Sequence, residues 1–550
     1  METIRLALVS LLLVITFFIY QAWQAQRPQP APPPALEQGT LPTPTAGPTA
    51  VTPAASPAGT VPAAPSATRP PGTPVTVSTD VMKVQINTAG GDIARLDLAN
   101  FRASAARDAA AYSILDAAPP RFYESQTGLL AADTARAPDH LALYSAESDR
   151  YQLADGADAL EVPLAWSDAG SGVEVRKVYT FRRGRYDIGL RYEVRNGGDQ
   201  PWQAQPYAQL MRKKGADAHG SIFMPASFQG AVYYSAADKY RKLSYDDMLK
   251  SPLATTLSDG WVGLSEHYFV TVFLLTKGQA QSCYTKALAE DRFLAGCIGG
   301  PLAVAPGQST LWETRLYAGP KAQDSLEGVA EGLALTVDYG KLTVIAQPVF
   351  WLLSTIHGAI GNWGWAIILV TLLIKLGFYR LSAASYRSMA HMRKVQPKIM
   401  ALRERYKDDR QQLNEKMMEL YRTEKINPLG GCLPILVQIP VFIALYWVLL
   451  ESVELRHAPF ALWIRDLSGA DPYYVLPVLM GVSMFLQQRM TPMIGMEPMQ
   501  RRIMLAMPLV FTVFFALFPA GLVLYWFVNN VLSIAQQWFI NHQLERKAAA

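Results

Sequence analysis

The stretch Gly364-Trp-Ala-Ile-Ile-Leu-Val-Thr-Leu-Leu-Ile-Lys-Leu-Gly-Phe-Tyr379 is apolar over the length of a helix except for one cation, Lys375. No Asp or Glu occurs in it or in the four apolar segments downstream, so no carboxylate there neutralises the charge. A charge at bilayer depth costs about 3 kcal/mol or more, so such residues usually face a partner or a watery cavity. We therefore expect a hydrated, positively charged pocket around Lys375. The alternative is that Lys375, about a turn from Arg380, reaches the cytoplasmic headgroups.

The composition of the chain argues against several classes of function. Its 550 residues are too many for one core, and 50% are hydrophobic while 17% are charged. No metal-type cluster of cysteine and histidine occurs, and neither does a nucleophile elbow, a phosphate loop or a dinucleotide fingerprint. We expect no catalytic residues, no metal and no cofactor, so the protein is predicted not to be an enzyme.

The N-terminal part predicts a membrane anchor followed by a linker. In residues 1–27 the run Leu6–Trp23 is apolar, and Gln21-Ala-Trp-Gln24 has no small-x-small cleavage pattern. An uncleaved signal anchor is the preferred interpretation, and a cleaved signal peptide is the alternative. Residues 28–74 are rich in Pro, Ala and Thr and cannot bury enough surface to offset the entropy of ordering.

Residues 75–338 read as a large, soluble all-β domain. Polar and apolar residues alternate in Val173–Phe181 and again in Tyr186–Val194, and Asn196-Gly-Gly198 supplies the next turn. Many short strands with such turns indicate a large β-sandwich. Cys283 and Cys297 flank a probable hairpin, and the sequence leaves open whether they form a disulfide or remain two buried thiols.

Residues 339–361 predict an amphipathic helix lying along the membrane surface, because polar residues interrupt its short apolar run. Residues 362–545 then hold five further apolar segments that come close to the length of a membrane span. With the anchor they make six predicted transmembrane helices. The five segments are Asn362–Arg380, Gly431–Leu450, Tyr473–Gln488, Ile503–Phe518 and Gly521–Ile540.

The short loops indicate how these spans are oriented. The segment 382–427 contains eleven Lys or Arg residues, whereas 451–472 contains only Arg456 and Arg465. The positive-inside rule places the basic segments in the cytoplasm. Both termini are then predicted to be cytoplasmic, with residues 28–338 on the outer side.

The basic segment 382–427 predicts a cytoplasmic helical hairpin. Apolar residues from Val395 to Tyr406 repeat at helical spacing, and those from Leu413 to Leu420 form a matching face. The hairpin is either a self-packed pair with a solvated basic exterior or a docking arm for a ribosome, nascent chain or partner protein. The sequence does not separate these readings, and it shows no motif for specific nucleic acid recognition.

Uncharged polar residues accompany Lys375 in the predicted spans. Thr371 lies one turn before it on the same helix face, and Gln438 lies at mid-depth in the next span. Each could simply make an interhelical hydrogen bond. We predict instead that they line a hydrophilic groove that binds substrate. The predicted groove residues are Lys375, Thr371, Gln438, Trp526, Tyr525 and Asn529.

Six short motifs in order make the chain resemble a known family. They are Gly361-Asn-Trp-Gly364, Gln396-Pro-Lys-Ile399, Asn427-Pro-Leu-Gly-Gly-Cys-Leu-Pro434, Ala458-Pro-Phe-Ala-Leu-Trp463, Asp471-Pro-Tyr-Tyr474 and Phe518-Pro-Ala-Gly-Leu-Val-Leu-Tyr525. With the anchor and the outer domain, the chain resembles the YidC family of membrane protein insertases of Gram-negative inner membranes. The family's groove arginine falls at Lys375, which keeps the charge but loses the forked donor geometry.

The resemblance implies a five-helix core around a groove open to the cytoplasm, and an outer domain of the β-supersandwich class. It implies insertion and folding of nascent membrane proteins in the lipid bilayer, alone or with the Sec translocon. Contact with the ribosome through the hairpin is a further expectation. Two alternatives remain from the residues: a solute transporter with an intramembrane cationic site, and an envelope assembly factor acting through its β domain.

Overall fold

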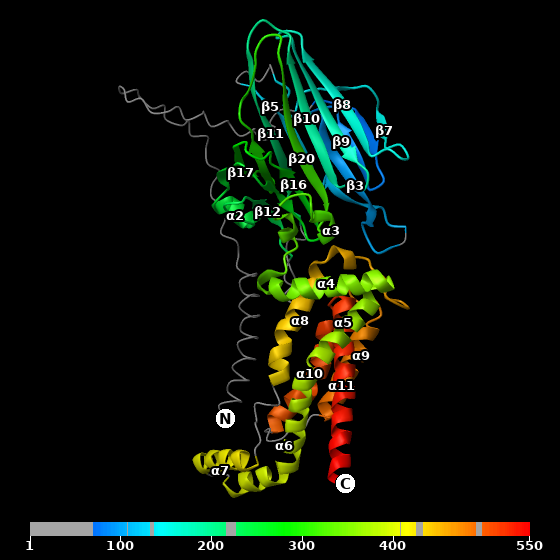
Figure 1. Cartoon of the computed structure of the whole chain (residues 1–550), viewed down its shortest axis with the longest axis vertical. Helices are drawn as coiled ribbons and strands as arrows, with labels where there is room; N and C mark the ends of the chain where they lie inside the picture. The colour runs from blue at the N-terminus through cyan, green and yellow to red at the C-terminus, as the bar shows by residue number, and fades with distance from the viewer. Residues whose placement is uncertain are drawn as a thin grey trace, which may run out of the picture.

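The computed structural model describes residues 70–549, except 107, 132–136, 216–226, 407–408, 425–432 and 491–497. The predicted anchor at 1–27 and nearly all of the linker at 28–74 lie outside the described residues, as does Cys432. A β domain occupies one end of the elongated molecule and a group of helices the other (Figure 1).

Alternation of polar and apolar residues builds the β domain, as β9 (Val173–Arg182) illustrates. Its apolar residues from Val173 to Phe181 are buried, while Glu174 and Arg176 are exposed. β9 pairs antiparallel with β10 (Asp187–Asn196) through a turn in which Gly184 has a φ of 68°, a conformation that favours glycine. The other strands are β1 (Pro74–Ser78), β2 (Met82–Asn87), β3 (Asp92–Arg102), β4 (Ala111–Asp116), β5 (Tyr123–Leu130), β6 (Ser145–Ala146), β7 (Arg150–Gln152), β8 (Ala159–Asp168), β11 (Trp202–Lys213), β12 (Gly230–Tyr234), β13 (Arg241–Ser244), β14 (Ala254–Leu257), β15 (Trp261–Ser265), β16 (Phe269–Leu274), β17 (Gln281–Leu288), β18 (Arg292–Ile298), β19 (Leu302–Val304) and β20 (Ser309–Pro320).

Two sheets share one hydrophobic core in this domain. The first has the order β14-β17-β18-β11-β5-β4-β3-β2-β1-β7, with β19 beside β11, and the second has the order β13-β12-β15-β16-β20-β10-β9-β8-β6. Buried side chains such as Ile86 and Leu96 from the first sheet and Val175 and Tyr192 from the second belong to the same core. The predicted β-rich domain is thereby confirmed.

A disulfide joins β17 and β18. Cys283 and Cys297 lie directly opposite each other in this antiparallel pair and are bonded. Both are nearly inaccessible to solvent. The structure thus decides a question that the spacing of the cysteines left open.

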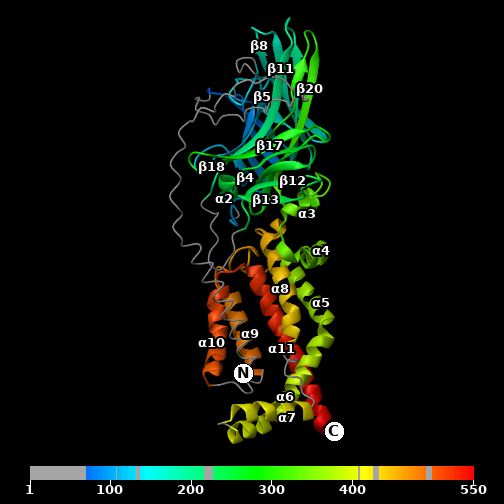
Figure 2. The same ribbon diagram turned by 90° about the vertical axis from the view of Figure 1, so that its left-hand side faces the viewer.

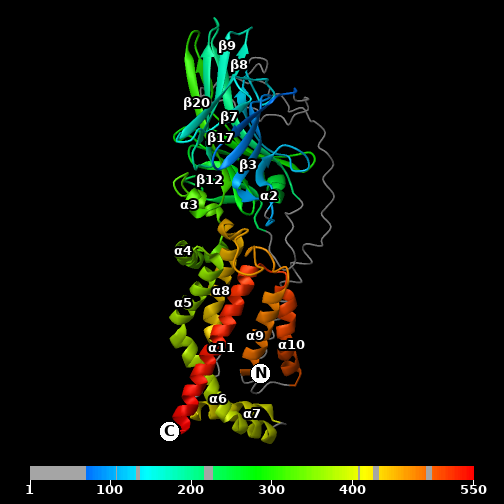
Figure 3. The ribbon, with the colours of Figure 1, turned by 90° about the vertical axis from the view of Figure 1, so that its right-hand side faces the viewer.

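The helical region consists of upright helices with helices lying crosswise at both of their ends (Figure 1). Figures 2 and 3 show α9 and α10 side by side, and α11 packs against α5, α6 and α9. The helices are α2 (Tyr245–Lys250) and α3 (Gln323–Leu326) in the β domain, then α4 (Thr343–Ile360), α5 (Trp363–Gly377), α6 (Tyr379–Arg405), α7 (Arg410–Thr423), α8 (Leu433–Glu451), α9 (Val475–Met490), α10 (Pro498–Phe515) and α11 (Ala520–Ala549), with 3-10 turns at Leu333–Thr336, Gly340–Leu342 and Val453–Leu455.

Helix α4 runs across the ends of α5 and α8, between the β domain and the upright helices (Figure 1). By length and composition, α4 is the one described helix that could itself cross a bilayer. α5 and the first part of α6 would qualify together, but they are bent by 66° at Phe378. The helix that corresponds to the predicted span Asn362–Arg380 therefore ends at Gly377. The chain bends at Phe378 and continues as the long polar helix α6.

Helices α6 and α7 form the two arms of the basic segment. Val395 and Ile399 of α6 are buried against Met417 and Leu420 of α7. Asp409 caps α7 by accepting hydrogen bonds from the backbone N–H groups of the second and third residues that follow it. Part of the predicted turn and the end of the second arm lie outside the described residues.

Candidate functional site

A small hollow between α5, α6 and α8 contains two of the predicted groove residues. Lys375 reaches it from the last turn of α5, and Gln438 from α8. The other lining residues are Ile374, Phe378, Leu381 and Ser382. The bend at Phe378 contributes to this hollow, because it carries the start of α6 to the side of α5.

The ammonium of Lys375 is held by a neutral group. Its Nζ donates a hydrogen bond of 2.8 Å to Oγ of Ser533 on α11. Ser533 is buried, donates in turn to the backbone carbonyl of Asn529, and is hydrogen-bonded to the Tyr386 side chain of α6. Among the described residues, no carboxylate interacts with Lys375. The cation is therefore oriented but not neutralised.

A second polar contact lies beside this one. Nε2 of Gln438 donates to Oδ1 of Asn529, and Gln438 is also hydrogen-bonded to the Tyr525 hydroxyl. Because Asn529 and Ser533 are one helical turn apart on α11, the Gln438 and Lys375 contacts are stacked along one face of that helix. The structure thus brings Lys375, Gln438 and Asn529 together.

The remaining predicted residues take different places. Trp526 meets the ring of Phe442 edge-on at 4.5 Å, and Tyr525 stacks on the same ring at 6.0 Å. They form an aromatic layer one turn from Asn529. Thr371 is 1% exposed and donates to the carbonyl of Ile367 in its own helix. Its hydroxyl is therefore hydrogen-bonded within its own helix, and no contact with Lys375 is observed among the described residues.

The six predicted groove residues do not include Ser533 or Tyr386. For Ser533 a signal was present, because it follows Asn529 by four residues and so shares its helix face. Tyr386 lies in the basic segment, and only the bend at Phe378 brings it to α11. Other polar residues of α11 face α9 instead: Asn530 donates to Ser483 at 3.2 Å.

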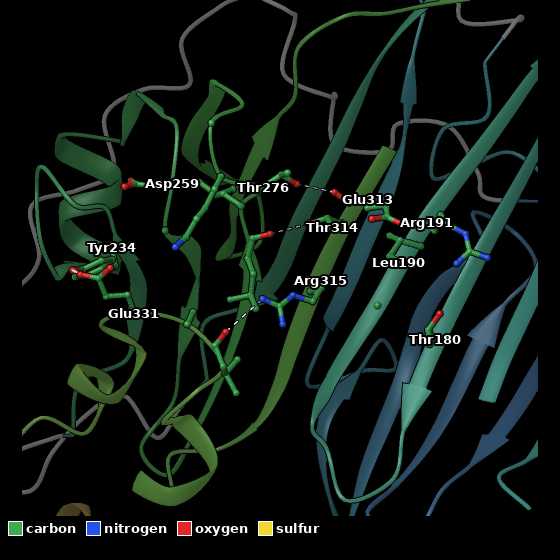
Figure 4. A pocket seen from close by; sticks show the side chains of 18 of the residues that line it. Thr180, Leu190, Arg191, Tyr234, Asp259, Thr276, Glu313, Thr314, Arg315 and Glu331 are labelled. Carbon is green, nitrogen blue, oxygen red and sulfur yellow. Dashed lines mark hydrogen bonds between the residues drawn. The ribbon is translucent and has the colours of Figure 1, made fainter. Parts of the chain in front are cut away.

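A large hollow lies elsewhere, against the second sheet of the β domain (Figure 4). It has a volume of about 1050 Å³ and is lined by both arginines and carboxylates. Its groups bond one another: Arg191 pairs with Glu161, and the Tyr234 hydroxyl donates to Glu331. These polar groups of the hollow are already paired with each other, and the hollow lies in the β domain away from Lys375, so we assign it no part in the site around Lys375.

Two family models match the chain, one over the β domain and one over most of the helical region. Residues 74–352 match the model of the YidC periplasmic domain, and residues 355–547 match that of the 60Kd inner membrane protein. The membrane protein insertase YidC of Methylobacillus flagellatus is 52% identical over 86% of this chain and 85% of its own length. That of Nitrosococcus oceani is 45% identical over the whole of both chains.

The match to a crystal structure of an active YidC insertase covers 84% of this chain and 93% of the chain in that structure, with 17% sequence identity and a TM-score of 0.38. The assignment of this chain to a family rests on the family models and on the relatives that are similar in sequence. The β domain and the helical region define an inner membrane protein with a large periplasmic domain. The chain belongs to the YidC family of membrane protein insertases, which are not enzymes.

Proposed function

We propose that this chain inserts and folds integral membrane proteins through a hydrophilic, positively charged groove formed around Lys375 by α5, α8 and α11. The observation that carries the proposal is the hydrogen bond from Lys375 to the neutral Ser533, with no carboxylate partner among the described residues. A cation held in this way keeps its attraction for a negatively charged or polar segment of a client.

The groove lowers the cost of bringing polar client segments into the bilayer. Gln438, Asn529 and Lys375 offer donors and acceptors that partly replace water. The driving force comes from the client, whose apolar helix gains roughly 25 cal/mol for each Å² that it transfers from water into lipid. The insertase needs no energy source or cofactor for this step.

The membrane topology that we propose follows from the distribution of basic residues among the loops. We propose six transmembrane helices, both termini in the cytoplasm, residues 28–338 in the periplasm, and a groove that opens to the cytoplasm. The position of α4 across the upright helices supports a place along the membrane surface (Figure 1). The two-sheet β domain supports assignment to the supersandwich class.

The partners that we propose are nascent membrane proteins, the lipid bilayer and the Sec translocon. The helical hairpin of α6 and α7 supports a ribosome contact, because its exposed surface carries several basic residues, among them Arg387, Lys394, Lys398, Arg405 and Arg422. Nothing in its pattern indicates recognition of a nucleic acid sequence.

Reconstitution of the purified protein in liposomes with a short two-span client tests the groove. We expect Lys375→Glu to lower the insertion rate roughly tenfold or more, equivalent to about 1.4 kcal/mol, and Lys375→Ala to lower it less. Lys375→Arg should retain most activity because it keeps the charge. Lys83→Glu, the same charge change on the exposed surface of β2, is the matched control. Normal insertion by Lys375→Glu would contradict the proposal.

A further inference from the structure

The outer end of α8 is fixed to the β domain by buried polar groups. Glu451, the last residue of α8, is 3% exposed and accepts a hydrogen bond of 3.2 Å from Ser227. His267 lies 3.8 Å from the same carboxylate and 3.0 Å from the carbonyl oxygen of Leu450. Both partners belong to the β domain, so the end of a core helix is held from outside the core.

A buried cation of the β domain completes this contact. Lys321 follows the last strand, β20, and is 2% exposed. Burial lowers the pKa of Lys321 to about 8, and the negative charges of Glu451, Asp338 and Glu266 oppose this effect. Lys321 and Glu451 are both buried, and their opposite charges attract each other across the contact between α8 and the β domain.

Neighbouring contacts restrict the same segment. The guanidinium of Arg456, five residues beyond α8, lies 5.1 Å from the ring centre of Tyr112 and 5.5 Å from that of Phe269. Ser452 lies 3.4 Å from the hydroxyl of Tyr339. One hydrophobic cluster also continues from the β domain through α4 into α5, α8 and α11. The contact is therefore continuous with the packing of the core.

The opposite half of α8 carries Gln438, which bonds Asn529 in the proposed groove. The 13 positions between Gln438 and Glu451 correspond to about 20 Å of helix. We propose that Lys321 and Glu451 are positioning residues: the buried carboxylate of Glu451, held by Ser227 and attracted by the charge of Lys321, seats α8 against the β domain and so places Gln438 against α11. The consequence for insertion rests on the groove proposed above, whereas the placement of α8 can be measured without it.

Cross-linking of cysteine pairs tests the placement. In full-length protein with Cys432→Ser, Gln438→Cys with Asn529→Cys reports the distance between α8 and α11. The matched control pair, Lys375→Cys with Ser533→Cys, reports the distance between α5 and α11. We expect Glu451→Gln or Lys321→Met to slow disulfide formation by the first pair about fivefold or more and to leave the second within about twofold. Because the two residues act together, the double variant should be no slower than the slower single variant.

Lys321→Arg keeps the charge and should restore the rate of the first pair. Glu419→Gln, on the exposed face of α7, should change neither pair. If a buried variant fails to fold, Ser227→Ala removes one hydrogen bond to Glu451 and should slow the first pair by a smaller factor. Equal slowing of both pairs, or an unchanged first pair, would overturn the proposal.

Client insertion by Glu451→Gln, measured in the liposome assay, completes the test. We expect it to fall by about the same factor as the cross-linking rate. Slower cross-linking with normal insertion would overturn the positioning role. Normal insertion by Lys375→Glu with the expected cross-linking pattern would instead contradict the groove.

Discussion

Two lysines, Lys177 in the β domain and Lys375 in the helical region, show how differently one side chain is used in the two parts of the molecule. Lys177 is fully buried, lies 3.2 Å from Asp92 and donates to the carbonyls of Gly90 and Thr127. Three tyrosine rings surround its ammonium at 5.5 to 5.6 Å. Lys375 is half-buried and is held by one hydroxyl.

The difference separates a structural cation from a functional one. A lysine with a carboxylate, carbonyls and aromatic faces around it has little left to offer a ligand, and it holds the strands that surround it together. A lysine with a single neutral partner stabilises the fold little, yet it retains most of its charge for an arriving segment. The degree to which a buried cation is neutralised is thus a physical criterion for its role.

Replacing each lysine by methionine breaks this comparison most directly. Lys177→Met leaves Asp92 buried without its ammonium partner and should lower the free energy of unfolding by about 3–5 kcal/mol. Lys375→Met loses one hydrogen bond to a neutral group and should cost about 1 kcal/mol or less. Urea unfolding of the full-length protein, followed by tryptophan fluorescence, measures both changes. Similar losses of stability in the two variants would show that the comparison is wrong.

The disulfide sharpens the contrast, because it strengthens only the β domain. Cys283 and Cys297 are 14 positions apart, and closing such a loop contributes roughly 3 kcal/mol in the chain-entropy model. Cys283→Ala with Cys297→Ala should lower the unfolding free energy of the β domain by about that amount, in the same assay. The insertion rate should change less than about twofold, since the disulfide is far from Lys375. Cys432→Ala, at the remaining cysteine, should leave the stability of the β domain unchanged.

The contact between the two regions should respond to pH through Glu454, in the turn after α8. Burial, with a smaller contribution from nearby Asp324, raises the pKa of this carboxyl to about 7, and backbone hydrogen bonds, including one from Gln323, oppose the shift. Because the pKa of Glu454 is raised in the folded state, protonation of this carboxyl stabilises the fold. That contribution to the free energy of unfolding is fully present below the pKa of the unfolded chain, near 4.5, and is lost as the pH rises through 7.

Glu454→Gln imitates the protonated acid and should therefore equal the parent protein near pH 4.5. Its relative stability should rise by roughly 1–2 kcal/mol by pH 8, less than the full shift of the pKa implies because the site is partly accessible. Thermal unfolding of both proteins from pH 4.5 to 8 measures this difference. A difference that stays constant with pH would exclude Glu454 as its source.

Local patterns of the sequence determined the division of the chain. Alternation of period two predicted the β domain, and long apolar segments with basic loops predicted the helical region. The absence of carboxylates near Lys375 showed that its charge had no partner on its own helix. These features depend on residues close in sequence, so they can be recognised before any packing is known.

Tertiary structure alone decided which groups meet. Thr371 and Lys375 are one turn apart on the same face of α5. In the folded chain, however, Thr371 donates to a carbonyl of its own helix, whereas Lys375 donates to Ser533 of α11. The bond between Cys283 and Cys297 and the seat of Glu451 in the β domain likewise join separate elements. The rotation and tilt of each element are set by its packed neighbours, and no local pattern of residues carries that information.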